Sequence, residues 1–300
     1  MKKKSAALLL VIAGTIALAG FMVLSAPQSF DGVVPTGHKR DVANGKIMYD
    51  AGGCISCHKP DKGEGDASLP SGGAPLPTPV GVFYPPNITG HKESGIGKWS
   101  DEQFVNAMMA GVSPTGKHYF PAFPFTSYAR MKVSDVLDLK AYLMSLKSVD
   151  ASSHKKTSLF GEAILRRGLG LWKRINFDRS GFIADKNRTP ELNRGAYLVA
   201  GPGHCNECHT PRNISMGLDF SRHLAGGPHP EGKGKVPSLR GLKKRKRFSS
   251  VSDLNSALRF GEILGYEDMS SGGMGDVQTN ISKLPEADSK AIAAYLWSLP

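Results

Sequence analysis

Two pentapeptides, Cys54-Ile55-Ser56-Cys57-His58 and Cys205-Asn206-Glu207-Cys208-His209, decide the fold of this 300-residue chain, and they contain all four of its cysteines. The spacing C-x-x-C-H is typical of covalent c-type haem attachment, in which two thiols become thioethers on the porphyrin and the imidazole binds the iron. The sequence therefore predicts two covalently bound haem c groups, attached through Cys54, Cys57, Cys205 and Cys208, with His58 and His209 as axial iron ligands.

Other uses of paired cysteines fit these residues less well. A thioredoxin-like motif needs a βαβ surround and no following histidine. A four-cysteine zinc site would have its pairs roughly 15 to 20 residues apart, whereas Cys54 and Cys205 are 151 residues apart. Two ordinary disulfides would leave the repeated histidine without a role.

The composition is that of a globular chain, with 40% hydrophobic and 21% charged residues. This balance excludes collagen, wholesale disorder and a polytopic membrane protein. The 35 glycines and 20 prolines predict a chain rich in loops, with a core filled in part by a group other than protein side chains. The net charge of +12 would suit nucleic acid, an anionic membrane or an acidic protein.

The N-terminus predicts a membrane segment. Three lysines at positions 2–4 precede an uncharged run from Ala6 to Ala26, which as a helix would be about 32 Å long and match the hydrocarbon core of a bilayer. The lysines would stay in the cytoplasm, so that the remainder faces the bacterial periplasm. A cleaved signal, leaving a soluble periplasmic protein, is the alternative, but Leu24 and Pro27 disfavour its cleavage site.

The chain repeats one unit of roughly 110 residues. Gly45, Gly72-Gly73, Ala107 to Gly111 and Ala141-Tyr142-Leu143 recur in order as Gly195, Gly226-Gly227, Ala257 to Gly261 and Ala294-Tyr295-Leu296. We expect helices over 41–49, 100–110 and 134–146 in the first unit, with Ser134-Asp135 capping the last. In the second we expect them over 191–200, 252–260 and 286–298, with Pro285 at the start of the last.

Four segments follow from this repeat. They are an anchor or signal segment (1–30), a first mostly α haem domain (31–150), a basic linker helix (151–190) and a second haem domain (191–300). In the linker, apolar residues at helical spacing, from Phe160 to Ile175, lie beside basic ones. Either its apolar face packs across both units, or its basic face rests on anionic lipid or a partner subunit.

The sixth iron position separates an electron carrier from a catalyst, because methionine closes the site and raises the potential. In the second unit Met274 is the predicted ligand, since it lies in the glycine loop 272–275; Met269 is the alternative. In the first unit the corresponding place is near Phe123, which cannot ligate. Met131 is predicted there, and the alternatives are Met108, Met109 and His118. His204 is a candidate hydrogen-bond partner for a haem propionate.

Several stretches carry a resemblance to a known family: 72–74, 78–84, 87–89, 95–101, 119–128 and 293–296. Through them the chain resembles the cytochrome c subunits of membrane-bound periplasmic dehydrogenases for alcohols, gluconate and sugars. The resemblance covers residues 40 to 300. It implies two tandem class I cytochrome c domains. The chain departs from the family in having two C-x-x-C-H motifs where many members have three, and Phe123 where some have methionine.

The function expected is electron transfer in a periplasmic respiratory chain, from a dehydrogenase to quinone or a terminal oxidase, rather than catalysis. The alternative is a dihaem peroxidase or thiosulfate-oxidising cytochrome, which would need an open sixth position; a haem-based sensor is a third possibility. Eight basic residues between Lys233 and Arg247 form either a solvated face or a docking patch for an acidic partner. Nucleic acid does not fit the compartment.

Overall fold

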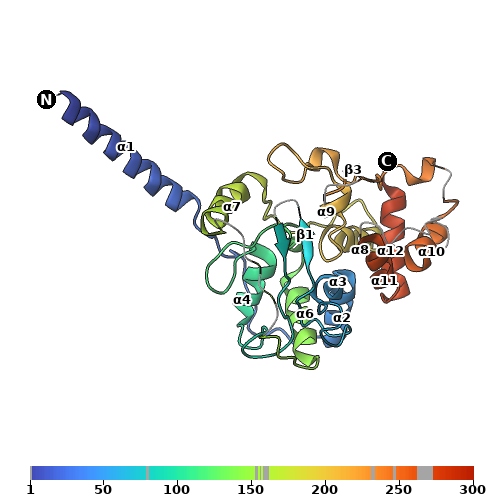
Figure 1. Ribbon diagram of the computed structural model, residues 1–300. Helices are drawn as coiled ribbons and strands as arrows, with labels where there is room; N and C mark the ends of the chain where they lie inside the picture. The colour runs from blue at the N-terminus through green and yellow to red at the C-terminus, as the bar shows by residue number, and fades with distance from the viewer. Residues whose placement is uncertain are drawn as a thin grey trace.

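The computed structural model describes residues 2–78, 81–152, 155, 157, 162–230, 234–245, 248–261 and 273–300. Helix α1 (Lys2–Leu24) projects from the rest of the molecule and carries the N-terminus at its far end (Figure 1). Its large apolar side chains are exposed. Among the described residues, Lys4–Leu24 is the helical segment long and apolar enough to cross a membrane. The N-terminal apolar helix that the sequence predicts is therefore present.

The first unit is helical, with one short hairpin. The hairpin pairs two antiparallel strands with Leu76 opposite Phe83. Its elements are α2 (Val42–Ala51), α3 (Cys54–His58), β1 (Leu76–Thr78), β2 (Gly81–Phe83), α4 (Asp101–Val105), the π-helix η1 (Asn106–Ala110), α5 (Phe125–Tyr128) and α6 (Val133–Ser145).

The second unit has a similar order of elements. Two antiparallel strands of two residues each form a hairpin, in which Gly227 pairs with Val236. Its elements are α8 (Pro190–Ala200), α9 (Asn206–His209), η2 (Phe220–Arg222), β3 (Gly227–Pro228), β4 (Lys235–Val236), η3 (Leu242–Lys244), α10 (Val251–Phe260), α11 (Met274–Ile281) and α12 (Glu286–Ser298). The mostly α class predicted from the sequence is confirmed.

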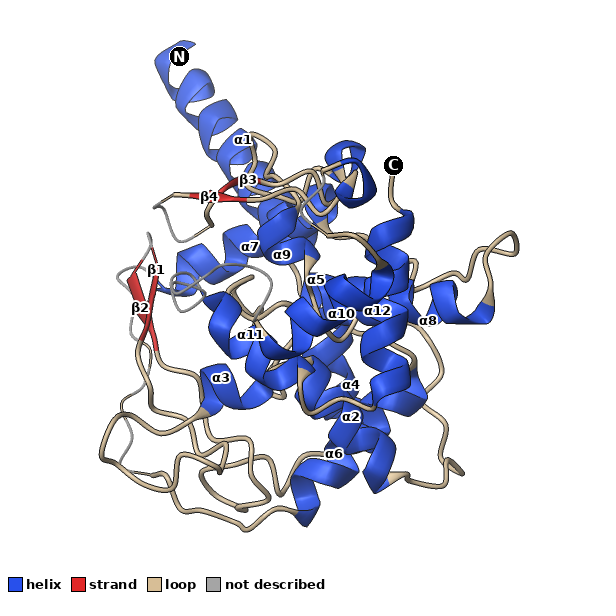
Figure 2. Cartoon of the chain, turned by 90° about the vertical axis from the view of Figure 1, so that its right-hand side faces the viewer, coloured by secondary structure: helices blue, strands red, loops and turns tan. Residues whose placement is uncertain are grey.

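Each unit is built on a close crossing of its first and last long helices, α2 with α6 and α8 with α12 (Figure 2). At Gly45 an added Cβ would lie 2.1 Å from the Asp138 carbonyl oxygen, and at Gly195 it would lie 1.9 Å from that of Ala291. A side chain at either position would force the helices apart. The buried apolar side chains of both units form one continuous core.

Most helix ends lie within two residues of their predicted positions. Ser100 begins α4 with a capping box to Gln103, and α12 starts directly after Pro285. The predicted cap at Ser134 is wrong, because α6 already begins at Val133 and Lys132 is its N-cap residue. The predicted loop at Met274 is also wrong. Met274 is the first residue of α11, after Gly273 in a left-handed conformation with φ +85°.

The linker contains helix α7 (Glu162–Asn176), which lies at the base of α1 (Figure 1). Ile164 and Ile175 are exposed. The side chains of Arg166 and Lys173 instead donate hydrogen bonds to carbonyl oxygens of the first unit. The predicted apolar packing across both units is therefore wrong for these isoleucines. Phe160 lies outside the described residues.

Candidate functional site

The first motif forms a single helical turn, α3, that begins after Gly53 in a left-handed conformation. The turn brings Cys54 and Cys57 close together, because residues three apart share one face of a helix. The His58 ring is fixed by the Pro86 carbonyl oxygen, 2.7 Å from its Nδ1. A carbonyl only accepts, so Nδ1 carries the proton and Nε2 keeps its lone pair for a metal.

The second motif repeats this geometry. His209 Nδ1 donates to the Pro237 carbonyl oxygen at 2.8 Å, and both carbonyls come 28 residues after their histidine. The carbonyl oxygen of each motif histidine also accepts a backbone N–H, from Gly72 at 2.6 Å and from Gly226 at 2.7 Å. Both histidines are thus held at ring and backbone by equivalent partners.

Positions 72 and 226 both require glycine. Their φ angles are +75° and +72°, in the left-handed region. An added Cβ would lie 2.4 Å from the Pro85 carbonyl oxygen at Gly72 and 2.5 Å from the Ser238 backbone nitrogen at Gly226. Only glycine can follow this path at such close approach.

The titration of the motif residues suits ligation and thioether formation. Burial lowers the pKa of His58 and of His209, so both imidazoles are neutral at physiological pH. Burial, with the neighbouring motif cysteine, raises the pKa of Cys54 and of Cys205 to about 12. No disulfide links any of the four cysteines. The donor set and its protonation therefore fit covalent haem c.

The segments that lead into the two motifs are in contact. His204, immediately before Cys205, has its Nε2 3.1 Å from the carbonyl oxygen of Gly52, two residues before Cys54. The sequence predicts His204 as a propionate partner; in the structure it bonds the backbone just before the first motif. Its ring also contacts Tyr128, with the centroids 5.8 Å apart.

Side chains of each unit also form hydrogen bonds with the motif of the other unit. Glu207 of the second motif is buried and accepts hydrogen bonds from Thr126 at 2.5 Å and Ser127 at 2.9 Å. Asn280 of α11 donates to Ser56 of the first motif at 2.8 Å. Both motifs therefore belong to one packed region, which the sequence did not predict because it depends on contacts between distant residues.

The predicted methionine ligands lie in different surroundings. Met131 is 4% exposed, in the core, three residues after Tyr128. Met274 is half-buried at the start of α11, a helix that packs on α10 and also on α2 of the first unit. Met108 and Met109 are buried in η1. His118 lies at the end of α1, with Nε2 3.0 Å from the Ser25 carbonyl oxygen, and Met269 lies outside the described residues.

Tyr128 is a residue that the sequence analysis missed. Burial, together with Cys54, Cys57 and Glu207, raises the pKa of its hydroxyl well above the ordinary value. Its ring packs on Phe123, which in turn packs on Tyr119, with 5.5 Å between centroids in each pair. The aromatic run 119–128 was the available signal.

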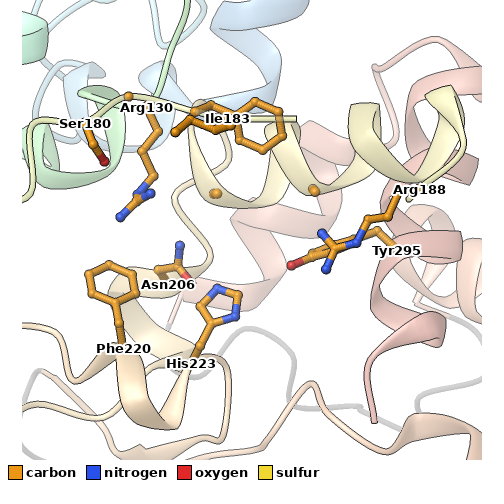
Figure 3. A pocket seen from close by; sticks show the side chains of 12 residues that line it. Arg130, Ser180, Ile183, Arg188, Asn206, Phe220, His223 and Tyr295 are labelled. Atoms are coloured by element: carbon orange, nitrogen blue, oxygen red, sulfur yellow. The ribbon is translucent and has the colours of Figure 1, made fainter. Parts of the chain in front are cut away.

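A cavity of about 250 Å³ lies beside the second motif and is lined by Arg130, Arg188, Asn206 and His223, among others (Figure 3). Burial and the positive charges of Arg130, Arg240 and Arg188 lower the pKa of His223 to about 4. The imidazole is therefore neutral, and the positive charge beside this motif comes from the arginines.

Comparisons with known proteins agree with this geometry. The cytochrome c family profile matches residues 42–147. The diheme cytochrome c-type protein of Cereibacter sphaeroides is 41% identical over 95% of this chain and 95% of its own length. A component of the nicotinate dehydrogenase of Pseudomonas putida is 38% identical over 85% of this chain and 21% of its own length.

The fructose dehydrogenase cytochrome subunit of Gluconobacter japonicus is 33% identical over 94% of this chain and 57% of its own length. The chain thus spans almost all of the first relative, about a fifth of the second and just over half of the third. By name, these relatives are a diheme cytochrome and subunits of dehydrogenases. We conclude that this chain is an electron-transfer protein that carries haem c and belongs to the cytochrome c family, together with diheme c-type cytochromes and dehydrogenase cytochrome subunits.

Proposed function

We propose that this chain is a membrane-anchored, periplasm-facing cytochrome with two haem c groups, which passes electrons from a periplasmic dehydrogenase towards quinone or a terminal oxidase. The observation that carries the proposal is the duplicated histidine geometry, in which two C-x-x-C-H turns present equivalent imidazoles. Haem c bound there would supply one-electron chemistry. The chain's own contribution is to hold both attachment turns in one rigid region.

The domain division proposed is an anchor (1–30), two class I cytochrome c domains (31–150 and 191–300) and a linker (151–190). Supporting it, each unit has its own glycine-based helix crossing, at Gly45 and at Gly195. Cys54 and Cys57 would hold one haem, and Cys205 and Cys208 the other. His58 and His209 would be the proximal ligands.

Met131 and Met274 are proposed as the distal ligands. For Met131 the support is burial beside Tyr128, whose carbonyl oxygen accepts its backbone N–H at 2.9 Å, and for Met274 a half-buried position at a helix start after a glycine. Met131→Ala and Met274→Ala should each remove half of the methionine-to-iron charge-transfer absorption of the oxidised protein. Met131→His should lower one reduction potential and leave the other, because imidazole favours ferric iron more than a thioether does. Unchanged spectra and potentials for a variant would refute that ligand.

Retention of α1 as an anchor has structural support. Arg167 donates to the Met22 carbonyl oxygen at 2.7 Å, and Arg174 to that of Leu24 at 2.6 Å. These carbonyls lie in the last turn of α1, where no further helical N–H can reach them. Cleavage after Ala26 would remove both acceptors. An N-terminal sequence beginning after residue 26 in the mature protein would refute the anchor.

A dehydrogenase partner is proposed, with docking at the exposed basic residues Lys243, Lys244 and Arg245; Lys233, Lys246 and Arg247 of the same run lie outside the described residues. The full chain, purified from native membranes without cross-linking, should retain a dehydrogenase. Neutralising these three residues should slow association and flatten its salt dependence. Purification of the chain alone, or an unchanged salt slope, would contradict the proposal.

A further inference from the structure

Helix α7 exposes its apolar face to solvent. Its exposed large apolar residues are Ile164 and Ile175, each 76% exposed, and Leu165, 49% exposed. Ile164 and Ile175 are eleven residues apart, three helical turns, so they share one face. In a soluble domain this face would be expected to pack inward.

The basic side of the same helix is turned into the protein. Lys173 is buried, and its Nζ donates to the carbonyl oxygens of Ala110 at 2.8 Å and Gly111 at 2.7 Å. Arg166 donates to the His118 carbonyl oxygen at 2.6 Å. These bonds fix the rotation of α7 about its axis and keep its isoleucines on the outside.

The position of α7 along α1 is fixed as well. Besides the bonds from Arg167 to Met22 and from Arg174 to Leu24, Gly170 touches the backbone of α1's end so closely that a Cβ there would lie 2.3 Å from the Ser25 carbonyl oxygen. The span Lys4–Leu24 would be about 32 Å long, close to the hydrocarbon thickness of a bilayer. α7 is therefore attached at the depth where α1 would leave the membrane.

The apolar surface continues beyond the helix. Trp172 donates from Nε1 to the Ser215 carbonyl oxygen at 2.8 Å, and Asn213 donates to the Asn176 side chain at 3.0 Å. These bonds hold a loop against α7 in which Ile214 and Met216 are exposed. Two more exposed apolar side chains are therefore carried on a loop held against α7.

We propose that α7 is an interfacial helix, which lies on the periplasmic surface of the bilayer with Ile164, Leu165 and Ile175 among the phospholipid headgroups and upper acyl chains. The proposal rests on α1 being a retained anchor. Burial of apolar side chains in the interface supplies the attraction. Together with α1, a second contact would restrict how the haem units tilt over the membrane. A phospholipid surface is the occupant chosen because α7 is bonded to the end of the membrane span, with its apolar face exposed.

Site-specific photo-crosslinking in the full-length protein tests this. A benzophenone amino acid replaces Ile164 or Ile175, in nanodiscs of phosphatidylethanolamine and phosphatidylglycerol. Val11 in α1 reports on the anchor, and Phe260, 57% exposed on α10, is the matched apolar control. In Figure 1, α10 lies on the opposite side of the molecule from α1. We expect lipid adducts at Val11, Ile164 and Ile175, several-fold above those at Phe260.

The outcomes separate the two proposals. Lipid adducts at Val11 with only background at Ile164 and Ile175 would overturn the interfacial helix and leave the anchor intact. Background at Val11 as well would overturn the anchor. In native membranes, adducts of Ile164 and Ile175 with a protein instead of lipid would show that a partner protein covers this face, and would also overturn the proposal.

Discussion

In the first unit Gly45 meets the Asp138 carbonyl, and His58 is fixed by Pro86; in the second, Gly195 meets the Ala291 carbonyl, and His209 is fixed by Pro237. The side chains at the two helix crossings nevertheless differ. Asn44 donates to Asp135 and Asp138 at 3.0 and 2.8 Å, whereas Arg194 forms a two-pronged ion pair with Asp288 at 2.8 and 2.9 Å.

Backbone geometry, rather than particular polar side chains, is therefore what the two units share. Close glycine contacts and carbonyl acceptors occur in both units. The surrounding polar contacts, and the surroundings of Met131 and Met274, differ. Two units with the same backbone geometry and different surrounding side chains would hold the same cofactor in different environments.

The largest effect is expected from breaking one attachment site. Replacing both thiols of one motif, either Cys54→Ala with Cys57→Ala or Cys205→Ala with Cys208→Ala, should halve the covalent haem per chain, because the other motif keeps both of its thiols. Haem content per chain after acid extraction measures this. If either double variant loses all covalent haem, the units do not mature independently.

Filling the helix crossing should have the next largest effect. Gly45→Ala and Gly195→Ala should each destabilise the protein by about 3 kcal/mol, because the new Cβ overlaps a backbone carbonyl that cannot move alone. Gly168→Ala in α7 is the control, since nothing lies within 4 Å of its Cβ position. Denaturant unfolding measures the change; a loss confined to one of the two crossings would show that the frames are not equivalent.

His204→Ala tests the contact between the units. Loss of the bond to Gly52 should cost about 1 kcal/mol and slow electron exchange between the haems, while both potentials stay unchanged. His204→Asn should retain part of the stability, since asparagine tolerates the left-handed backbone at φ +39° and keeps a donor. Pulse radiolysis follows the exchange; an unaltered rate would remove any electronic role for this bond.

The smallest effect is expected on stability at low pH. Burial alone would raise the pKa of Asp138, but hydrogen bonds from the Asp41 backbone, Asn44 and His38 hold the pKa below its usual value. This group therefore stabilises the fold fully above its unfolded pKa of about 3.9, and the contribution is lost as the pH falls through the lower folded pKa. Asp138→Asn should flatten the acid limb of the unfolding curve. A curve that keeps the parent slope would assign the acid sensitivity to other carboxylates.

Local sequence predicted the local structure well. The helix expected from residue 100 and the start of α12 after Pro285 depend on neighbouring residues, and the structure agrees. What it could not predict is set by distant partners. Arg166 and Lys173 turn inward because carbonyls of the first unit accept from them, and His204 bonds a residue 152 positions away. No periodicity in the sequence carries such information.

The central claim is that each motif of one intact chain holds its own haem c. Intact-mass spectrometry of the protein extracted from membranes, after acid treatment to remove unattached haem, tests it most directly. We expect the mass of the uncleaved 32.1 kDa chain plus two haem groups, with one haem on the peptide containing Cys54 and Cys57 and one on that containing Cys205 and Cys208. A chain that carries only one haem, or none, would contradict it.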